Sequence, residues 1–311
     1  MSIAGLKHYL SKRGSWFFIL SSRGLLNWMD DETYLKLLFR YSMGYSLDLE
    51  HPKTYNEKLQ WLKLHDRKPL YTQLVDKLEV KKYVADKIGP EYVVPVIAGP
   101  WDSVDEIDFD ALPEQFVLKC THDSGGVVIC RDKSSFDIEA AKAKLAKALR
   151  RNFYWANREW PYKDVKPRVF AEQYMGDDSG ADSAPNEFQF WCFHGAPRFI
   201  SAILEPHGRN LKCTYDPNWK RLPYVTSPPV YEKEFSAPPE LERMSSFAAM
   251  LCPGVPFVRV DFMIFNGRVY VGELTIFPAG GFVQWDPHEA DRHVGDMLDL
   301  DLIQTQAGDC P

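Results

Sequence analysis

The chain has 311 residues and a net charge of −6. This length is enough for two domains, and the negative charge argues against a general nucleic-acid-binding protein. With 45% hydrophobic and 26% charged residues, the composition is that of a soluble globular protein. Six cysteines are spread along the chain without a CxxC pair, which predicts reduced thiols, no zinc framework and a cytoplasmic location.

The first part of the chain is predicted to be mainly helical. Apolar residues recur at helical spacing in three segments: 31–40, 56–64 and 76–88. Thr54 or Asn56 would cap the second of these helices. The apolar run 16–20 follows basic residues but is too short to cross a membrane. We expect it to form a helix that packs on the body of the protein, with contact to a membrane surface as the alternative.

Strands and helices then follow without the regular alternation of a βαβ fold. Apolar or alternating segments predict strands at 93–97, 116–120, 127–130, 168–174, 187–193 and 198–203. Helices are predicted at 137–151 and 241–251, and irregular segments at 177–185 and 206–239. This mixture indicates an α+β fold.

The most informative segment is a pair of apolar runs around Asn266-Gly267, which predicts a β-hairpin. Asp261 on the first strand and Glu273 on the second can therefore lie close together, and Arg259 shares the face of Asp261. Carboxylates so placed can hold Mg²⁺ together with substrate phosphates. An ion pair with Arg259 is the alternative, because unpaired charges in so apolar a hairpin would be costly.

A second feature is an apolar strand that ends at Lys119 and is followed by the Gly-Gly-containing loop 120–126. Glycines allow backbone N–H groups to approach phosphate oxygens, and a phosphate would compensate a lysine in an apolar strand. The alternative is a Gly-Gly turn with a lysine that reaches solvent. His122 could donate to a phosphate or act as a base, or could hydrogen-bond only within its own loop.

Together these features resemble the ATP-grasp fold, in which two α+β subdomains grip ATP and carboxylates on a late hairpin hold Mg²⁺. The spacing of Lys77 and Lys119 is similar to that of two nucleotide-binding lysines in this superfamily. The strand around Glu172 resembles the hinge strand that holds adenine, and Glu187 resembles the acidic residue that binds ribose. The resemblance implies the following nucleotide-binding residues: Lys77, Lys119, Thr121, Ser124, Gly125, Gly126, Glu172, Met175 and Glu187. It implies Asp261 and Glu273 as metal ligands, and Arg259 and His122 as catalytic residues.

The segments 43–63, 75–77 and 118–122, together with both strands of the hairpin, more specifically resemble the TupA-like ATP-grasp family. Members of this family are associated with bacterial surface polysaccharide biosynthesis, including that of teichuronopeptide. The resemblance implies a helical N-terminal region and two ATP-grasp subdomains, over residues 1–75, 76–170 and 171–311.

Two positions differ from other ATP-grasp proteins. Thr275 stands where several ligases have an Asn two residues after the metal-binding Glu. A hydroxyl is a weaker oxygen ligand than an amide carbonyl, so the number of Mg²⁺ ions, one or two, stays open. Gln173 stands where some relatives have a Lys.

The resemblance implies an ATP-dependent carboxylate–amine ligase. A carboxylate would attack the γ-phosphate of ATP, and an amine would then capture the acyl phosphate. The implied carboxylate is a uronic acid of a polysaccharide precursor, and the implied amine is an amino acid or another small amine. A glycosyltransferase and a kinase that phosphorylates a sugar hydroxyl are the alternatives. Trp285, which follows the hairpin, could stack on a sugar ring or pack in the core.

Overall fold

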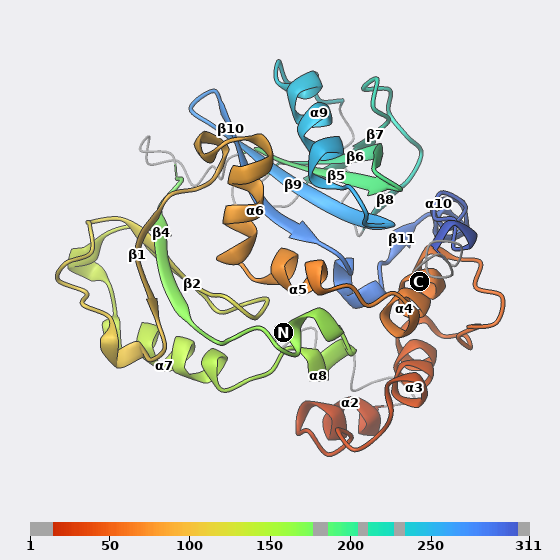
Figure 1. The fold of residues 1–311 in the computed structure, drawn as a ribbon, viewed down its shortest axis with the longest axis horizontal. Coiled ribbons are helices and arrows are strands. Elements are labelled where there is room, and N and C mark those ends of the chain that lie inside the picture. Colours follow the sequence, from red (N-terminus) through yellow and green to blue (C-terminus); the bar gives the residue numbers. More distant parts are fainter. Residues whose placement is uncertain (1–14, 177–185, 205–210, 227–233, 304–311) are drawn as a thin grey trace, which may run out of the picture.

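The computed structural model describes residues 15–176, 186–204, 211–226 and 234–303. Its strands are β1 (Val96–Trp101), β2 (Phe116–Cys120), β3 (Val127–Cys130), β4 (Val169–Gln173), β5 (Asn186–Phe193), β6 (Ala196–Leu204), β7 (Leu211–Tyr215), β8 (Val225–Thr226), β9 (Phe257–Phe265), β10 (Arg268–Thr275) and β11 (Trp285–Asp286). They form a four-stranded sheet of order β1-β4-β2-β3, a five-stranded sheet of order β10-β9-β5-β6-β7, and the pair β8-β11 (Figure 1).

The helices are α2 (Ser15–Ser22), α3 (Asp31–Met43), α4 (Tyr55–His65), α5 (Pro69–Val75), α6 (Glu79–Ile88), α7 (Ile138–Leu149), α8 (Tyr154–Asn157), α9 (Leu241–Leu251) and α10 (Ala290–Gly295). Short 3₁₀ turns include η4 (Trp160–Tyr162) and η6 (Pro278–Gly281). Helices α2 to α6 precede the first strand, so the predicted helical N-terminal region is confirmed.

Most predicted elements are confirmed, with shifts at their ends. Strand β1 begins at Val96, later than predicted, and α6 begins at Glu79. The irregular segment predicted at 206–239 was wrong where β7 and β8 lie, and the segment predicted at 177–185 lies outside the described residues. Thr54 is the cap of α4 and forms a capping box with Glu57, because each side chain accepts from the other's backbone N–H.

The four-stranded sheet buries one face under α7. Phe116, Leu118 and Cys120 alternate along β2 and share a core with Leu145 of α7. Lys119 lies between them and faces the opposite side. The strand period therefore directs this lysine away from the core, to the side on which it pairs with Glu172 of β4.

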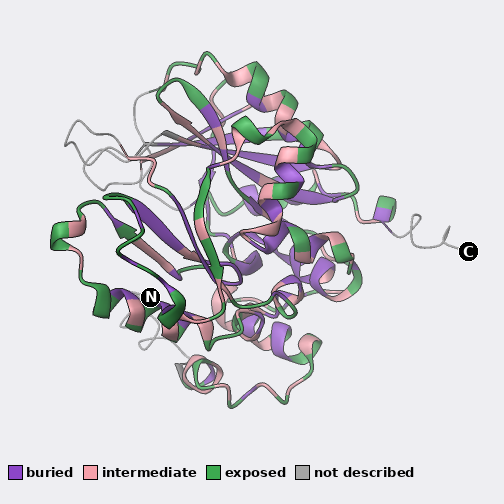
Figure 2. Ribbon diagram, turned by 60° about the vertical axis from the view of Figure 1, so that its left-hand side comes forward, coloured by how far each residue is buried: buried purple, intermediate pink, exposed green. Residues whose placement is uncertain are grey.

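The five-stranded sheet is also covered on one face by helices. Val258, Val260 and Phe262 of β9 are fully buried and share a core with Met244, Ala248 and Leu251 of α9, which lies beside the sheet (Figure 1). Arg259 and Asp261 alternate with these β9 residues and share the other face. The strands in the interior of the molecule are largely buried (Figure 2).

Helix α4 carries a buried polar stripe that fixes the chain after β10. Asn56, Gln60 and Lys63, spaced along one helical face, are at most 1% exposed. Asn56 pairs with the backbone of Val283 in both directions, and Gln60 donates to the Gly281 carbonyl at 2.7 Å.

Lys63 is the most deeply placed charge of this stripe. Its Nζ donates to the Gly280 carbonyl at 2.6 Å, the Asn157 carbonyl at 2.8 Å and Gln60 Oε1 at 2.9 Å. Burial lowers the pKa of Lys63 to about 7, against the opposing effect of Glu159. Three acceptors match the three donors of an ammonium, so the charged form of Lys63 has a partner for every N–H.

The described chain has two large hydrophobic cores and two small clusters in its N-terminal region, one of which joins Phe17 of α2 to Tyr34 and Leu38 of α3. The larger of the two cores joins the five-stranded sheet to α4, α5, α6 and α9, and the smaller joins the four-stranded sheet to α7. The division into units at residues 75 and 170 stays a prediction. The five cysteines that the structure describes are buried free thiols. Among the described residues, no helix is long and apolar enough to cross a membrane.

The turn η6 yields a stability prediction. Gly281 has φ +73°, and a Cβ there would lie 2.4 Å from the buried Nε2 of Gln60. Gly254 has a similar φ of +75° but has nothing within 4 Å of such a Cβ. We expect Gly254→Ala to cost about 1 kcal/mol from backbone strain alone. Gly281→Ala should cost about 2–3 kcal/mol, because the clash adds to that strain. Equal losses in urea unfolding would show that α4 does not hold η6 tightly.

Candidate nucleotide and metal site

The predicted hairpin is confirmed, and it brings the two carboxylates together. Strands β9 and β10 are antiparallel, with Asp261 opposite Glu273 and Arg259 opposite Thr275. The register shifts between Val271 and Glu273, and this irregularity sets Glu273 opposite Asp261. All four side chains therefore share the open face of the sheet.

Arg259 lies between the two carboxylates. Its Nε is 2.7 Å from Asp261 Oδ1, and its Nη2 is 2.5 Å from Asp261 Oδ2 and 2.9 Å from Glu273 Oε1. Nη2 also lies 3.2 Å from the hydroxyl of Thr275, which donates to Glu273 Oε1 at 2.9 Å. The ion pair weighed against a metal site is thus present.

The two carboxylates differ in their access to solvent. The Asp261 side chain is 6% exposed, whereas that of Glu273 is 47% exposed. Burial raises the pKa of Asp261 well above its usual range, although Arg259 opposes this. Burial also acts on Glu273, but Arg259 and Lys77 outweigh it and lower the pKa of that carboxyl. Glu273 is therefore the accessible member of the pair.

The residues present fit a magnesium ion that is shared with a substrate. Among the described residues, no group of three or more acidic, His or Cys side chains forms a complete metal cage. Mg²⁺ commonly takes only one or two carboxylates and completes its shell with phosphates and water. Asp261 and Glu273 face each other across the hairpin, and Nη2 of Arg259 contacts both, so one cation could lie between them. The hydroxyl of Thr275 is engaged by Glu273.

Lys77 connects this hairpin with the glycine-containing loop. Its backbone N–H donates to the Thr121 carbonyl at 3.0 Å, and its Nζ donates to the Asp123 carbonyl. Burial lowers the pKa of Lys77, and the nearby charges of Glu273 and Asp123 oppose that shift. Lys119 acts on Lys77 as a neighbouring like charge. Two lysines and one carboxylate thus converge from three separate segments.

The loop after Lys119 is buried where it begins and exposed at its tip. Thr121 is buried, and its hydroxyl donates to the Lys166 carbonyl at 2.7 Å. Ser124 and Gly125 are exposed, and Gly125 has φ +132°. The Gly126 N–H donates to Asp123 Oδ1 at 3.1 Å, and a Cβ at Gly126 would lie 2.6 Å from that atom. The tip can therefore offer backbone groups, but the Thr121 hydroxyl is already used.

His122 has a different set of partners from those predicted. It is 2% exposed, and its Nε2 lies 3.1 Å from the carbonyls of both Ala148 and Arg151 at the end of α7. These contacts favour the alternative of a structural hydrogen bond. Its catalytic role stays a prediction.

Glu172 holds two lysines, one of which the sequence did not single out. Lys119 pairs with Oε1 of Glu172, and Lys81 pairs with Oε2 at 2.8 Å. Lys81 also donates to the Val94 carbonyl at 2.9 Å. Burial raises the pKa of Glu172, but the two lysines outweigh it and lower that pKa. Lys81 was missed because its helical spacing gives no sign that β4 lies beside α6.

Apolar side chains flank Glu172 on the open face of the four-stranded sheet. Residues paired across the four strands form one row of Val96, Glu172, Val117 and Ile129. Val96 is 40% exposed and Ile129 is 49% exposed. An exposed apolar surface around a polar group suits a flat heteroaromatic ring. Met175 is half-buried just beyond the end of β4.

Glu187 lies on the open face of the five-stranded sheet. It accepts from Gln189 at 2.6 Å, and Gln189 is paired with Asp261 across the strands. Lys212 of β7 lies in the same row across the strands as Glu187 and therefore on the same face. The charges of Arg259, Glu187 and Asp261 are close enough to affect its pKa. Lys212 was missed because it falls in the Pro- and Asn-rich segment predicted to be irregular.

Trp285 packs in the core and does not offer a face to a sugar. It is 7% exposed and contacts the rings of Tyr55, Trp191, Phe199 and Tyr224. The buried alternative for this residue is therefore the one observed.

The chain belongs to the TupA-like ATP-grasp family, whose model matches residues 57–299. The predicted α+β ATP-grasp fold and the family resemblance are thereby confirmed. No curated protein is significantly similar to this chain.

Solved structures of several other proteins are similar to this chain. D-alanine–D-alanine ligase from Bacillus anthracis, complexed with ATP, is 17% identical over 77% of this chain and 68% of its own, with a TM-score of 0.45. The ATP-grasp ligase PsnB, complexed with Mg and ADP, is 10% identical over 90% and 72%, with a TM-score of 0.39. The ADP complex of PurK is 13% identical over 78% and 56%, with a TM-score of 0.40.

The lysines of this site yield a binding prediction. Mg·ATP should raise the melting temperature, because a ligand that binds only the folded state stabilises it by about 2.7 kcal/mol at 100 times its Kd. Lys119→Ala should remove most of that increase in a thermal shift assay. Lys82→Ala is the matched control, because Lys82 is 69% exposed and pairs only with Glu79 among the described residues. An unchanged shift in Lys119→Ala would exclude Lys119 from the nucleotide site.

Proposed function

We propose that this protein is an ADP-forming carboxylate–amine ligase that joins its substrates through an acyl phosphate. The observation that carries the proposal is the meeting of three segments: the loop after Lys119, the residue Lys77, and the hairpin with Glu273. A phosphate chain needs cations on one side and a carboxylate-bound metal on the other. Family membership supports the same chemistry.

In this proposal the nucleotide lies between the two sheets. Its base would rest on the apolar row around Glu172, beside Met175, and its ribose would reach Glu187. Lys77 and Lys119 would bind the phosphates, with backbone groups of Ser124 and Gly125. Gly126 would shape the loop, because its N–H is bonded to Asp123 and its carbonyl accepts from Cys120. Lys119 would exchange Glu172 for a phosphate, while Lys81 keeps the charge of Glu172 compensated.

Asp261 and Glu273 would hold Mg²⁺, which when bound would neutralise charge on the phosphates. Arg259 would orient both carboxylates and present its charge to the acyl phosphate or to the oxyanion formed when the amine attacks. One preorganised donor of this kind contributes about 3–4 kcal/mol to the transition state. Lys212, on the same face as Glu187, would bind a further anionic group of the substrates.

The substrate assignment rests on the family. We propose a uronic acid unit of a bacterial surface-polysaccharide precursor as the carboxylate, and an amino acid or another small amine as the acceptor. A kinase that phosphorylates a sugar hydroxyl is the second candidate, because the same cations and carboxylates would serve either acceptor. A glycosyltransferase is less well supported, because it consumes no ATP and would leave the proposed nucleotide site without a role.

Glu273→Gln should lower turnover by about 100-fold or more, the scale expected when one electrostatic stabiliser is lost. Asp261→Asn should act in the same direction. The assay is release of phosphate from ATP with a panel of uronic acid derivatives and amino acids. Glu242→Gln, an exposed change on α9, is the control. Near wild-type turnover by Glu273→Gln at saturating Mg²⁺ would place the metal elsewhere.

The reaction class is tested with substrate labelled by ¹⁸O in its carboxylate. An acyl phosphate must transfer one carboxylate oxygen to the released phosphate, so mass spectrometry should find the label there. Phosphate without label, together with a phosphorylated sugar product, would exclude the ligase and favour the kinase.

A further inference from the structure

The N-terminal helices present large apolar side chains to solvent. Trp28 is 80% exposed, Leu25 is 56% exposed and Trp16 is 50% exposed. Phe17 and Leu26, from the same short stretch, are buried. Among the described residues no other tryptophan is as exposed. We call Trp16, Arg23, Leu25 and Trp28 the N-terminal surface; it lies on and just after α2, at the edge of the molecule (Figure 1).

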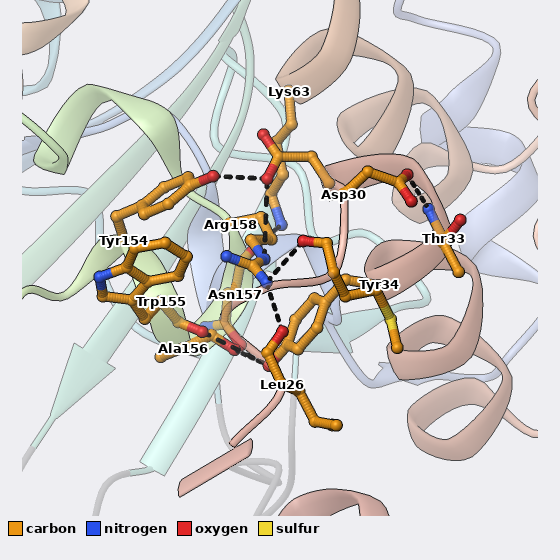
Figure 3. Close-up of polar contacts among 12 residues, drawn as sticks. Leu26, Asp30, Thr33, Tyr34, Lys63, Tyr154, Trp155, Ala156, Asn157 and Arg158 are labelled. Carbon is orange, nitrogen blue, oxygen red and sulfur yellow. Dashed lines mark hydrogen bonds and ion pairs between the residues drawn. The ribbon is translucent and has the colours of Figure 1, made fainter. Parts of the chain in front are cut away.

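The turn that bears Leu25 and Trp28 is held from within by Arg158. Nη2 of Arg158 donates to the Leu26 carbonyl at 3.1 Å and to the Met29 carbonyl at 3.2 Å (Figure 3). These bonds draw the backbone of the turn inwards, while Leu25 and Trp28 stay outside. The exposed side chains thus stand on an ordered support.

Arg158 itself is enclosed. Its side chain is 0% exposed, and its guanidinium lies 4.3 Å from the ring centre of Tyr34 and 4.7 Å from that of Trp155 (Figure 3). Asp31 lies 3.7 Å from its Nε. A cation packed between aromatic rings and beside a carboxylate is firmly placed. Because Arg158 fixes the backbone of this turn, the fold itself keeps the side chain of Trp28 in solvent.

The first 29 residues of the chain carry only basic charges. They contain Lys7, Lys12, Arg13 and Arg23 and no acidic residue, although the whole chain carries a net charge of −6. Asp30, Asp31 and Glu32 follow directly, but Asp31 pairs with Arg67 and Arg158, Glu32 pairs with Lys36, and Asp30 caps α3. Tryptophan favours the boundary between water and lipid, where its ring is partly buried and its N–H stays hydrated. Basic residues near such rings are attracted to anionic headgroups.

We propose that the N-terminal surface docks on an anionic lipid bilayer. Such a bilayer offers negative charge to the basic residues of this part of the chain, and an apolar layer that can take up Trp16, Leu25 and Trp28 together. The contact is peripheral and reversible, and it orients the protein at the membrane surface.

The test is sedimentation of the full chain with vesicles of phosphatidylcholine, alone or mixed with phosphatidylglycerol. We expect the wild type to sediment with the mixed vesicles and less with the neutral ones, and added salt should weaken binding. The double variant Leu25→Ala/Trp28→Ala should lose binding several-fold. Met250→Ala is the matched control, because Met250 is 46% exposed on α9, outside this surface.

Three results would overturn the proposal: no sedimentation with mixed vesicles at low salt, equal binding to neutral vesicles, or equal binding by the double variant. Analytical ultracentrifugation without lipid tests whether a second copy of the chain binds this surface instead. A dimer that the double variant dissociates would assign the N-terminal surface to a second copy.

Discussion

The site depends on one buried cation held between two carboxylates. Arg259 is 14% exposed and binds both Asp261 and Glu273. Removing one member of such a pair typically costs about 3–5 kcal/mol, because the other charge stays buried without compensation. Burying this face of the hairpin is therefore possible only if all three groups are kept. Glu273 remains the open side of the network, where a further cation can enter.

The three lysines of the site, like Arg259, each lie near a carboxylate. Lys77 faces Glu273, and Lys81 and Lys119 share Glu172. Each lysine therefore has a carboxylate near it when no nucleotide is bound, and the cost of desolvating the cations is partly offset. A phosphate chain can replace those contacts without leaving a carboxylate unpaired, because Lys81 stays with Glu172. The lysines therefore stay charged and in place, and they can still bind a phosphate chain.

The sequence predicted the features that depend on local rules. The hairpin followed from alternation and an Asn-Gly turn, and Lys119 stood out because a lysine interrupts an apolar strand. The roles of Lys81 and Lys212 could not be predicted, because they depend on which elements pack together. The buried stripe of Asn56, Gln60 and Lys63 looks like an ordinary polar helix face until the chain after β10 is placed against it.

The central claim is that Glu273 and a bound nucleotide together hold one divalent cation. Electron paramagnetic resonance of Mn²⁺, added in place of Mg²⁺ with a non-hydrolysable ATP analogue, tests it directly. We expect one tightly bound Mn²⁺ that requires both the analogue and Glu273. With Glu273→Gln, the spectrum should be that of free Mn²⁺. Tight Mn²⁺ binding that persists in Glu273→Gln, or that does not depend on the nucleotide, would contradict it.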